Sequence, residues 1–492
     1  MKHLFLILSA VFLFIKSPGQ PIQYYSGAII ENYSAEKFHL FDQDSSSLYA
    51  FLKDDANFFL DVFSKESLQR TEHVKIPIPV NYMINYEFER LIVRKDTFHL
   101  FYSYFERVEL CEKLEMITFT KGETGNEQRF LIDKSEGKSI RKAGRFSVIN
   151  EKESNKFLSF GSKRVKDTWH VNLDHFDYSG NKIRSQDFRL YESWYILHTI
   201  IDEDYNIINI AKSNPYNKNA NWRLQIYSPN SDHPKIIELN KASLRNIYLS
   251  NSFNWISDKQ KFTVIASPYS SRPSATEAEG VYIAKINPRT HVLMSEHVIP
   301  FKKYGEGDDT KPFSLPSCVL RDIILTNKDG LKLIFETGLW EQATFLVIPI
   351  GQEFNIGSII SVELNSQNQV TEIRKIKKQQ ETMKAGYPFT GFFTLCHGDS
   401  TYFIYNELPE NLQRTPDKMK VISQINIDKT IVIYTVVDSG KVVRKKLADK
   451  INGTGMDAVL PITALTGSTK KEVFVVSKLK DKFYLTKFFI TD

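Results

Sequence analysis

The 492-residue sequence predicts an all-β fold of repeated four-stranded antiparallel units, and three observations lead to this prediction. Aromatic residues make up 13% of the chain, with 35 Phe and 23 Tyr, and such residues favour strands. Segments typical of buried strands recur, each with a polar turn, a short apolar run and a polar exit, as in Ser400–Glu407. Hairpin turns rich in Gly, Asn, Asp, Pro and Ser separate these segments at similar spacings.

The spacing of the hairpin turns gives the number of units. The turns centre on Glu66, Glu123, Gly180, Asn230, Pro288, Ser366 and Ser439. They follow one another at intervals of 50 to 78 residues, as expected of a repeat array. The two longest intervals contain three insertions, at Lys302–Pro316, Thr337–Asn355 and Asn406–Lys418.

One unit shows the strand order that we expect in all of them. Its four strands are predicted at Phe146–Asn150, Lys156–Phe160, Trp169–Tyr178 and Ile183–Leu190. Four antiparallel strands, repeated radially so that neighbouring sheets cover each other, are the plan of a β-propeller. A pair of β-sandwiches also offers many hairpins, but it does not predict this recurring order.

The two ends of the chain predict how the ring closes. Ala458–Ala464, Glu472–Ser477 and Lys482–Ile490 supply three strands of a last blade that has no fourth strand of its own. Ile22–Ile30 is a spare strand, and pairing it with this blade would protect two exposed edges. We therefore expect eight blades, with seven as the alternative, in a single propeller domain over residues 20–492.

Residues 1–19 have the pattern of a cleavable signal peptide. Lys2 and His3 precede the apolar run Leu4–Ile15, which is shorter than a membrane span, and small residues precede Gln20. The pattern predicts a secreted, periplasmic or cell-surface protein without a transmembrane segment after signal removal.

Charge and cysteine content exclude some classes of function. The net charge of +6 would fall to +4 without Lys2 and Lys16, which makes no case for nucleic acid. Two basic segments, Ile373–Gln380 and Lys441–Lys450, are predicted on outer strands, where lysine discourages edge pairing, and a polyanion-binding stripe is the alternative. The three cysteines, Cys111, Cys318 and Cys396, lie far apart and are predicted to be core thiols.

Strand exits of the type "YFIYNE" (Tyr402–Glu407), together with the repeated units, carry a resemblance to a known class. The sequence resembles exported bacterial β-propeller-like proteins over nearly its whole mature length. That resemblance implies a propeller at the cell envelope. It gives no residue a role, because the signature motifs of the well-known propeller families are missing.

Motifs for catalysis or metal binding are also missing from the sequence. There is no Gly-x-Ser-x-Gly elbow, no phosphate-binding glycine loop, no His-Glu-x-x-His and no Cys-x-x-Cys. The acidic runs Asp42–Ser47 and Asp202–Asn206 are interpreted as turns rather than calcium loops. We expect no cofactor and no metal site.

The insertions predict a binding face. In a propeller of this strand order, the loops that hold them emerge on one face around the mouth of the central channel. Aromatic, carboxylate and amide side chains in these loops suit sugar or peptide recognition. The candidate ligand-binding residues are Glu336, Trp340, Glu341, Asn406, Glu407, Tyr269, Tyr216 and Trp222.

These residues support a main hypothesis and two alternatives. The main hypothesis is a non-catalytic binding or scaffold protein that engages a protein or glycan partner at the cell envelope. The first alternative is a glycan- or peptide-processing enzyme that uses Glu336, Glu341 and Glu407 at the channel mouth. A purely structural role in an envelope assembly is the second.

Overall fold

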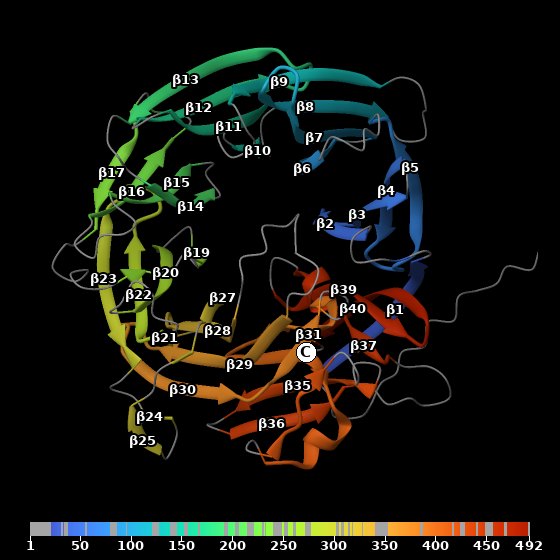
Figure 1. Ribbon diagram of the computed structural model, residues 1–492, viewed down its shortest axis with the longest axis vertical. Helices are drawn as coiled ribbons and strands as arrows, with labels where there is room; N and C mark the ends of the chain where they lie inside the picture. The colour runs from blue at the N-terminus through green and yellow to red at the C-terminus, as the bar shows by residue number, and fades with distance from the viewer. Residues whose placement is uncertain are drawn as a thin grey trace, which may run out of the picture. The chain divides into compact units, whose positions relative to one another are not determined.

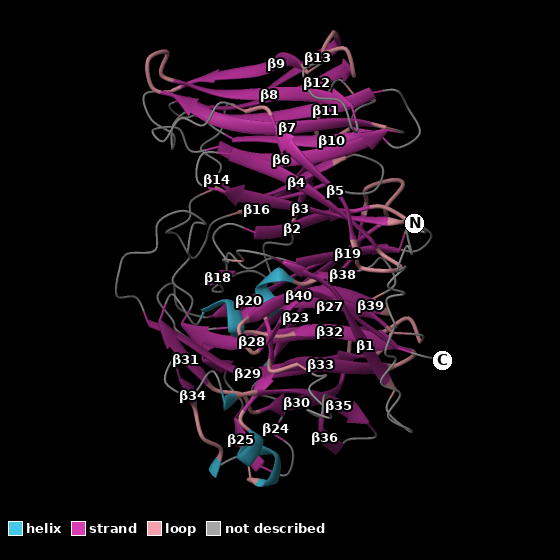
Figure 2. Ribbon diagram, turned by 90° about the vertical axis from the view of Figure 1, so that its right-hand side faces the viewer, coloured by secondary structure: helices cyan, strands magenta, loops and turns pink. Residues whose placement is uncertain are grey.

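The computed structural model describes residues 21–490 apart from short gaps, the longest being 79–85, 138–144, 214–220, 240–247, 340–352 and 448–455. The predicted signal segment, residues 1–19, lies outside the described residues. The protein is an all-β, eight-bladed β-propeller, which confirms the predicted fold class (Figures 1 and 2). The chain divides into two compact units, one of residues 1–55, 59–75 and 325–492 and the other of 56–58 and 76–324.

The unit of residues 76–324 contains four main sheets. The first two are β6 (Tyr86–Arg94), β7 (Thr97–Glu106), β8 (Cys111–Thr120) and β9 (Gln128–Glu136), then β10 (Arg145–Glu151), β11 (Lys156–Val165), β12 (Thr168–Asp177) and β13 (Lys182–Leu190). The third is β14 (Tyr195–Ile201), β15 (Ile207–Lys212), β16 (Trp222–Tyr227) and β17 (Lys235–Glu238). The fourth is β18 (Tyr248–Leu249), β19 (Asn254–Asp258), β20 (Phe262–Ser270), β22 (Gly280–Ile286) and β23 (Leu293–Pro300).

Short strands follow the fourth sheet, within the predicted insertion Lys302–Pro316 and around it. They are β21 (Glu277–Ala278) paired with β26 (Leu315–Pro316), and β24 (Gly305–Glu306) paired with β25 (Asp309–Pro312). The next strand is β27 (Cys318–Leu325), which is the edge strand of the following sheet.

The remaining sheets consist mainly of strands of the other unit, although β27 belongs to the unit of residues 76–324 up to Ile324. One is β2 (Phe38–Gln43), β3 (Ser47–Asp54), β4 (Asn57–Ser64) and β5 (Arg70–Ile76). The next combines β27 with β28 (Leu331–Leu339), β29 (Glu353–Leu364), β30 (Val370–Ile376), β31 (Gln380–Met383) and β34 (Ile422–Ser423). A third is β32 (Phe393–His397), β33 (Ser400–Glu407), β35 (Ile431–Asp438) and β36 (Lys441–Lys446), with the 3₁₀ turns η2 (Tyr387–Phe389) and η3 (Pro409–Gln413) beside it in the chain.

The last blade joins the two ends of the chain, as predicted. It contains β37 (Ala458–Val459), β38 (Leu465–Thr466), β39 (Glu472–Leu479), β40 (Lys482–Ile490) and β1 (Ile22–Ile30). β1 pairs antiparallel with β40 from Ile22 opposite Ile490 to Ile30 opposite Phe483 (Figure 1, blue beside red). The predicted strand Ala458–Ala464 was wrong in part, because Pro461 lacks an amide donor and starts the 3₁₀ turn η6 (Pro461–Thr463) between β37 and β38.

Burial within a sheet follows the position of each strand. The middle strands β15 and β16 are buried at every residue, whereas the outer strand β17 is exposed at three of its four residues. Middle strands read as continuous apolar runs because side chains on both faces are covered by neighbouring sheets. The hydrophobic core accordingly lies between consecutive sheets, as in the cluster that joins Phe101 and Met116 to Phe157 and Phe176.

The described residues also bear on the predictions for the acidic turns, the cysteines and a membrane span. Asp44 accepts hydrogen bonds from the Ser46 and Ser47 amides at 2.7 Å, as expected of an acidic turn, while 202–205 of the second acidic run lie outside the described residues. The three cysteines form no disulfide with one another, and Cys111 and Cys318 are buried while Cys396 is half-buried. Within the described part of the chain, no helix is long and apolar enough to span a membrane.

Candidate functional site

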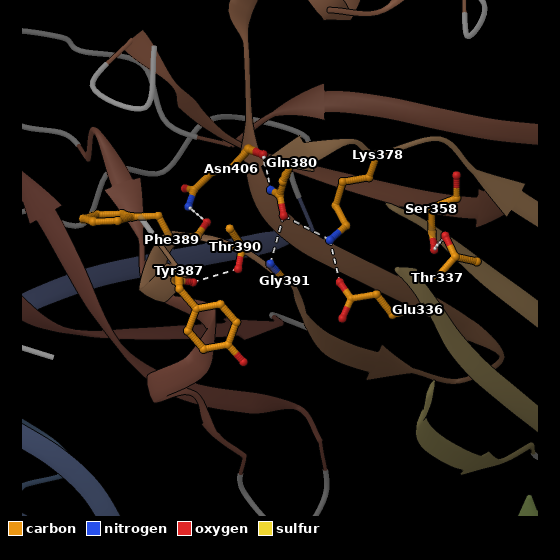
Figure 3. A network of polar contacts seen from close by, with 10 residues as sticks. All are labelled: Glu336, Thr337, Ser358, Lys378, Gln380, Tyr387, Phe389, Thr390, Gly391 and Asn406. Carbon is orange, nitrogen blue, oxygen red and sulfur yellow. Dashed lines mark hydrogen bonds and ion pairs between the residues drawn. The ribbon is translucent and has the colours of Figure 1, made fainter. Parts of the chain in front are cut away.

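The candidate site lies where the insertions after β28 and β33 begin. Both insertions lead from the second strand of their sheet to the third, as predicted. Glu336 stands near the end of β28, and Asn406 and Glu407 are the last residues of β33. A continuous chain of polar contacts connects the ends of these two strands (Figure 3).

A fully buried ion pair lies at the β28 end of this chain. The Lys378 ammonium donates to Glu336 Oε1 at 2.5 Å, and neither side chain has any exposed surface. Lys378 also donates to Gln380 Oε1 at 3.1 Å and lies 5.8 Å from the centre of the Phe392 ring. Two buried charges that neutralise each other and have additional partners hold their elements in one arrangement, because separating them leaves an uncompensated charge in the core.

Backbone geometry also fixes the end of β28. Gly338 has φ +154°, and a Cβ atom there would lie 2.4 Å from the Asn355 carbonyl oxygen in β29. Only glycine permits this approach, which occurs one residue before β28 ends. Residues 340–352 themselves lie outside the described residues.

Gln380 and Asn406 link the ion pair to the end of β33. The Gln380 side chain accepts from the Gly391 amide at 2.9 Å and donates to the Asn406 carbonyl at 3.2 Å. The Asn406 side-chain amide donates to the Phe389 and Val459 carbonyls at 2.7 Å, and its oxygen accepts from the Val459 amide at 2.9 Å. Asn406 is 1% exposed, so its polar atoms serve the protein's own backbone.

Glu407 anchors the insertion that follows it. Its Oε1 accepts from the Leu408 amide at 2.8 Å and from Asn411 Nδ2 at 2.7 Å. Asn411 in turn donates to the Lys420 carbonyl and accepts from the Lys420 amide, both at 2.8 Å. The two side chains therefore close residues 408–420 into a defined loop on β33.

The second oxygen of Glu407 has a different environment. Oε2 is buried and has no hydrogen-bond partner among the described residues. Burial raises the pKa of this carboxyl, while the Asn411 and Leu408 hydrogen bonds and the charges of Arg444 and Lys378 oppose that rise. Desolvation has the larger effect because it penalises the ionised form of a carboxyl that cannot reach water.

Two other predicted site residues belong to a different part of the chain. Trp222 and Tyr269 are 2% and 6% exposed and belong to the core of the β14–β23 sheets. Trp340, Glu341 and Tyr216 lie outside the described residues. A ligand-binding role for all eight residues stays a prediction.

Sequence reasoning missed Lys378 and Gln380, which stand at the centre of the network. The segment that contains them was interpreted only as a basic outer strand. Ile376, Lys378, Gln380 and Thr382 are all at most 2% exposed. They alternate with more exposed residues, so the period of two that marks one face of a strand was the available signal.

The described residues offer no arrangement for metal chemistry. Among them, no group of three or more His, Cys, Asp or Glu side chains could hold a metal ion. The two described carboxylates of the candidate site are both buried and engaged by the protein's own groups. The buried contacts at the ends of β28 and β33 fix the points at which two long insertions begin, on adjacent sheets.

Comparisons with known proteins give similarity of fold only. No protein-family model matches the chain, and no curated protein matches its sequence. Among solved structures, the β-propeller domain of the trilobed protease from Pyrococcus furiosus has a TM-score of 0.38 at 9% identity, over 85% of this chain and 97% of that one. The uncharacterised protein lmo1340 from Listeria monocytogenes has a TM-score of 0.32 at 10% identity, over 79% and 91%. A polysaccharide lyase, an ulvan lyase, has a TM-score of 0.36 at 12% identity, over 80% and 90%.

Proposed function

We propose that this β-propeller is an exported, non-catalytic binding or scaffold protein that engages a protein or glycan partner at the cell envelope. The partner docks on the insertions that follow β28 and β33. The main support for the proposal is the buried network from Glu336 to Asn406. This network fixes the starts of both insertions and exposes no reactive group of its own. Long loops that a rigid scaffold positions often carry binding.

The same network weakens the enzymatic alternative. A glycosidase-type mechanism needs two carboxyl groups open to substrate and to water. Glu336 is neutralised by Lys378 at zero exposure, and Glu407 is 1% exposed beneath its own insertion. Binding through the outer surfaces of the insertions needs neither side chain to be accessible.

The proposal is tested with the chain from Gln20 onward as bait against the envelope fraction of the native cells, in parallel with a glycan array. One variant has residues 341–351 replaced by a short Gly-Ser linker. Its matched control carries a linker of the same length inserted between Ser366 and Gln367, in the exposed hairpin turn of the same sheet.

We expect wild type and control to retain a partner that the loop variant loses. Equal capture by all three proteins, or no partner for wild type in both assays, would contradict the proposal. Export itself is checked separately, by fractionation of the native cells and by the N-terminal residue of the mature chain, which we expect to be Gln20.

A further inference from the structure

The positive charge of the chain is concentrated on one surface, formed by three segments that are distant in sequence. The segments are 370–382 with β30 and β31, 409–423 with η3 and β34, and 441–447 with β36. We call them together the cationic surface. Its described basic side chains at the surface are Arg374, Lys375, Lys377, Arg414, Lys418, Lys420, Arg444, Lys445 and Lys446.

Contacts between the three segments make this surface continuous. The Arg444 guanidinium on β36 donates to the Lys377 carbonyl at 3.2 Å, which joins the outer strands of two adjacent sheets. β34 pairs in parallel with β31, and the Ile422 amide donates to the Gln379 carbonyl at 3.0 Å. η3 lies against β36, which places the insertion after β33 beside the same strand.

The balance of charge on this surface is unusual for the chain. Nine basic side chains face three described glutamates, Glu372, Glu381 and Glu410. Over the three complete segments, eleven basic and four acidic residues give a formal charge of +7, against +6 for the complete protein, so the rest of the chain sums to −1. Like charges held together on a folded surface repel one another, and an anionic partner removes that repulsion.

Protection of strand edges explains only part of this charge. Lysine on β30 and β36 discourages pairing with another chain. Arg414, Lys418 and Lys420, however, lie in the insertion after β33 and outside its strand β34. The charge therefore continues from the outer strands onto a surface that the proposed function assigns to partner binding.

The composition of the cationic surface indicates the chemistry of its partner. The three segments contain no Phe, Tyr or Trp, so they offer no platform on which nucleic-acid bases could stack. Val442, at 38% exposure, is the one large exposed apolar side chain among their described residues, which gives little apolar area for entry into a lipid layer. Basic residues two apart on an extended strand are about 6–7 Å apart, a spacing that a linear polymer with regular charges can follow.

We propose that the cationic surface binds an acidic polysaccharide, a chain that carries carboxylate or sulfate groups at regular intervals. This inference rests on the proposed function, because it names the chemical class of a glycan partner and shares the insertion after β33. Exposed ammonium groups bind such a polymer mainly by charge, so the affinity falls as the salt concentration rises.

The experiment measures binding of the folded chain from Gln20 to heparin, a sulfated polymer, and to alginate, a polyuronate, with neutral dextran as a control. Binding is recorded at 50, 150 and 300 mM NaCl. The test variant is Lys375→Gln, Lys418→Gln and Lys445→Gln, one exposed lysine from each segment. The matched control is Lys75→Gln, Lys156→Gln and Lys328→Gln, exposed lysines elsewhere whose loss changes net charge equally.

We expect wild type to bind at least one acidic polymer with an affinity that decreases with salt, and not to bind dextran. The test variant should bind about tenfold more weakly than wild type at 150 mM NaCl, because it lacks three exposed ion pairs with the polymer. The affinity of the control variant should fall less than twofold. Equal losses for the two variants would overturn the inference, since only net charge would then matter. Absence of binding to both polymers at 50 mM NaCl would overturn it as well.

Three further measurements separate this inference from its alternatives. Vesicles with 30% phosphatidylglycerol that bind more tightly than either polymer would assign the surface to a membrane instead. Retention of an envelope partner by a protein that binds no acidic polymer would remove this inference and leave the proposed function intact. Loss of both activities in the variant that lacks 341–351, with the fold preserved by circular dichroism, would place the polymer at the other insertion and also overturn it.

Discussion

The buried pair of Glu336 and Lys378 gives the sharpest test of the candidate site. Replacing one partner by an apolar residue of similar size leaves the other charge in the core without compensation. Both side chains have zero exposure and their charged atoms are 2.5 Å apart, so water cannot replace the lost partner without opening the sheet. Breaking such a pair costs about 3–5 kcal/mol of folding free energy.

We therefore expect Glu336→Leu and Lys378→Met each to lower the free energy of unfolding by about 3–5 kcal/mol. At about 2–4 °C per kcal/mol for a unit of this size, the melting temperature should fall by roughly 6–20 °C. The double variant should be close to wild type or more stable than it, because a well-packed apolar pair avoids the desolvation of two charges. The two changes are thus strongly non-additive.

The assay is urea unfolding followed by circular dichroism, with calorimetry as a second measurement, for the wild type and all three variants. Glu410→Gln is the control, because it removes an ion pair of similar length, 2.8 Å, between exposed side chains, and no measurable loss is expected there. Single variants that cost less than about 1 kcal/mol, or a double variant that costs the sum of the two, would refute the reasoning.

Three further predictions follow from other buried groups. Burial, together with two neighbouring glutamates, raises the pKa of Glu112 from 4.5 to about 7, so the folded state loses stability as pH rises above 4.5. The free energy of unfolding of Glu112→Gln should exceed that of the wild type by up to about 3 kcal/mol at pH 9 and equal it at pH 4, measured by urea unfolding at both pH values. Burial and the charge of Arg94 lower the pKa of His99 from 6.5 to about 4, so stability that is present above pH 6.5 is lost as pH falls toward 4. In His99→Gln this loss of about 3 kcal/mol should be absent, and a profile of melting temperature against pH equal to that of the wild type would argue against the prediction. A Cβ atom at Gly280 would lie 2.3 Å from the Ile299 carbonyl oxygen, so Gly280→Ala should destabilise the fold by about 1–3 kcal/mol. Parallel thermal melts should show a smaller loss for Gly161→Ala, where the atom nearest to the added Cβ is a side-chain carbon at 3.2 Å.

The sequence alone was sufficient for the parts of the fold that depend on local pattern. The strands of the unit at 145–190 and the hairpin turns at Glu66, Gly180, Pro288 and Ser366 follow from turn residues and apolar runs, which act over a few residues. The pairing of Ile22–Ile30 with Lys482–Ile490 followed from counting strands, since the last blade otherwise lacks its fourth strand. The broken strand after Ala458 is the instructive exception, because Pro461 was visible in the sequence and its effect on a ladder hydrogen bond was foreseeable.

The candidate site was less predictable because burial depends on the neighbouring sheet. Trp222 and Tyr269 looked like loop aromatics, yet adjacent sheets cover them, and nothing in their own segments specifies those neighbours. Lys378 looked like one of several edge lysines, but it is the one whose partner, Glu336, is 42 residues away on β28. A basic residue at a buried position becomes predictable only when its counter-charge is known to face it.

The direction of these polar side chains bears on where recognition can occur. Asn406 and Glu407 are the residues that suggested a ligand, and all of their recorded hydrogen bonds go to backbone or side chains of the same unit. The Asn406 amide already forms hydrogen bonds with three backbone groups. Binding a sugar or a peptide would break these hydrogen bonds, and their loss would cost about as much free energy as the new hydrogen bonds supply. If the proposed function is correct, we therefore expect recognition to use other side chains than Asn406 and Glu407, which hold the start of the insertion after β33 in place.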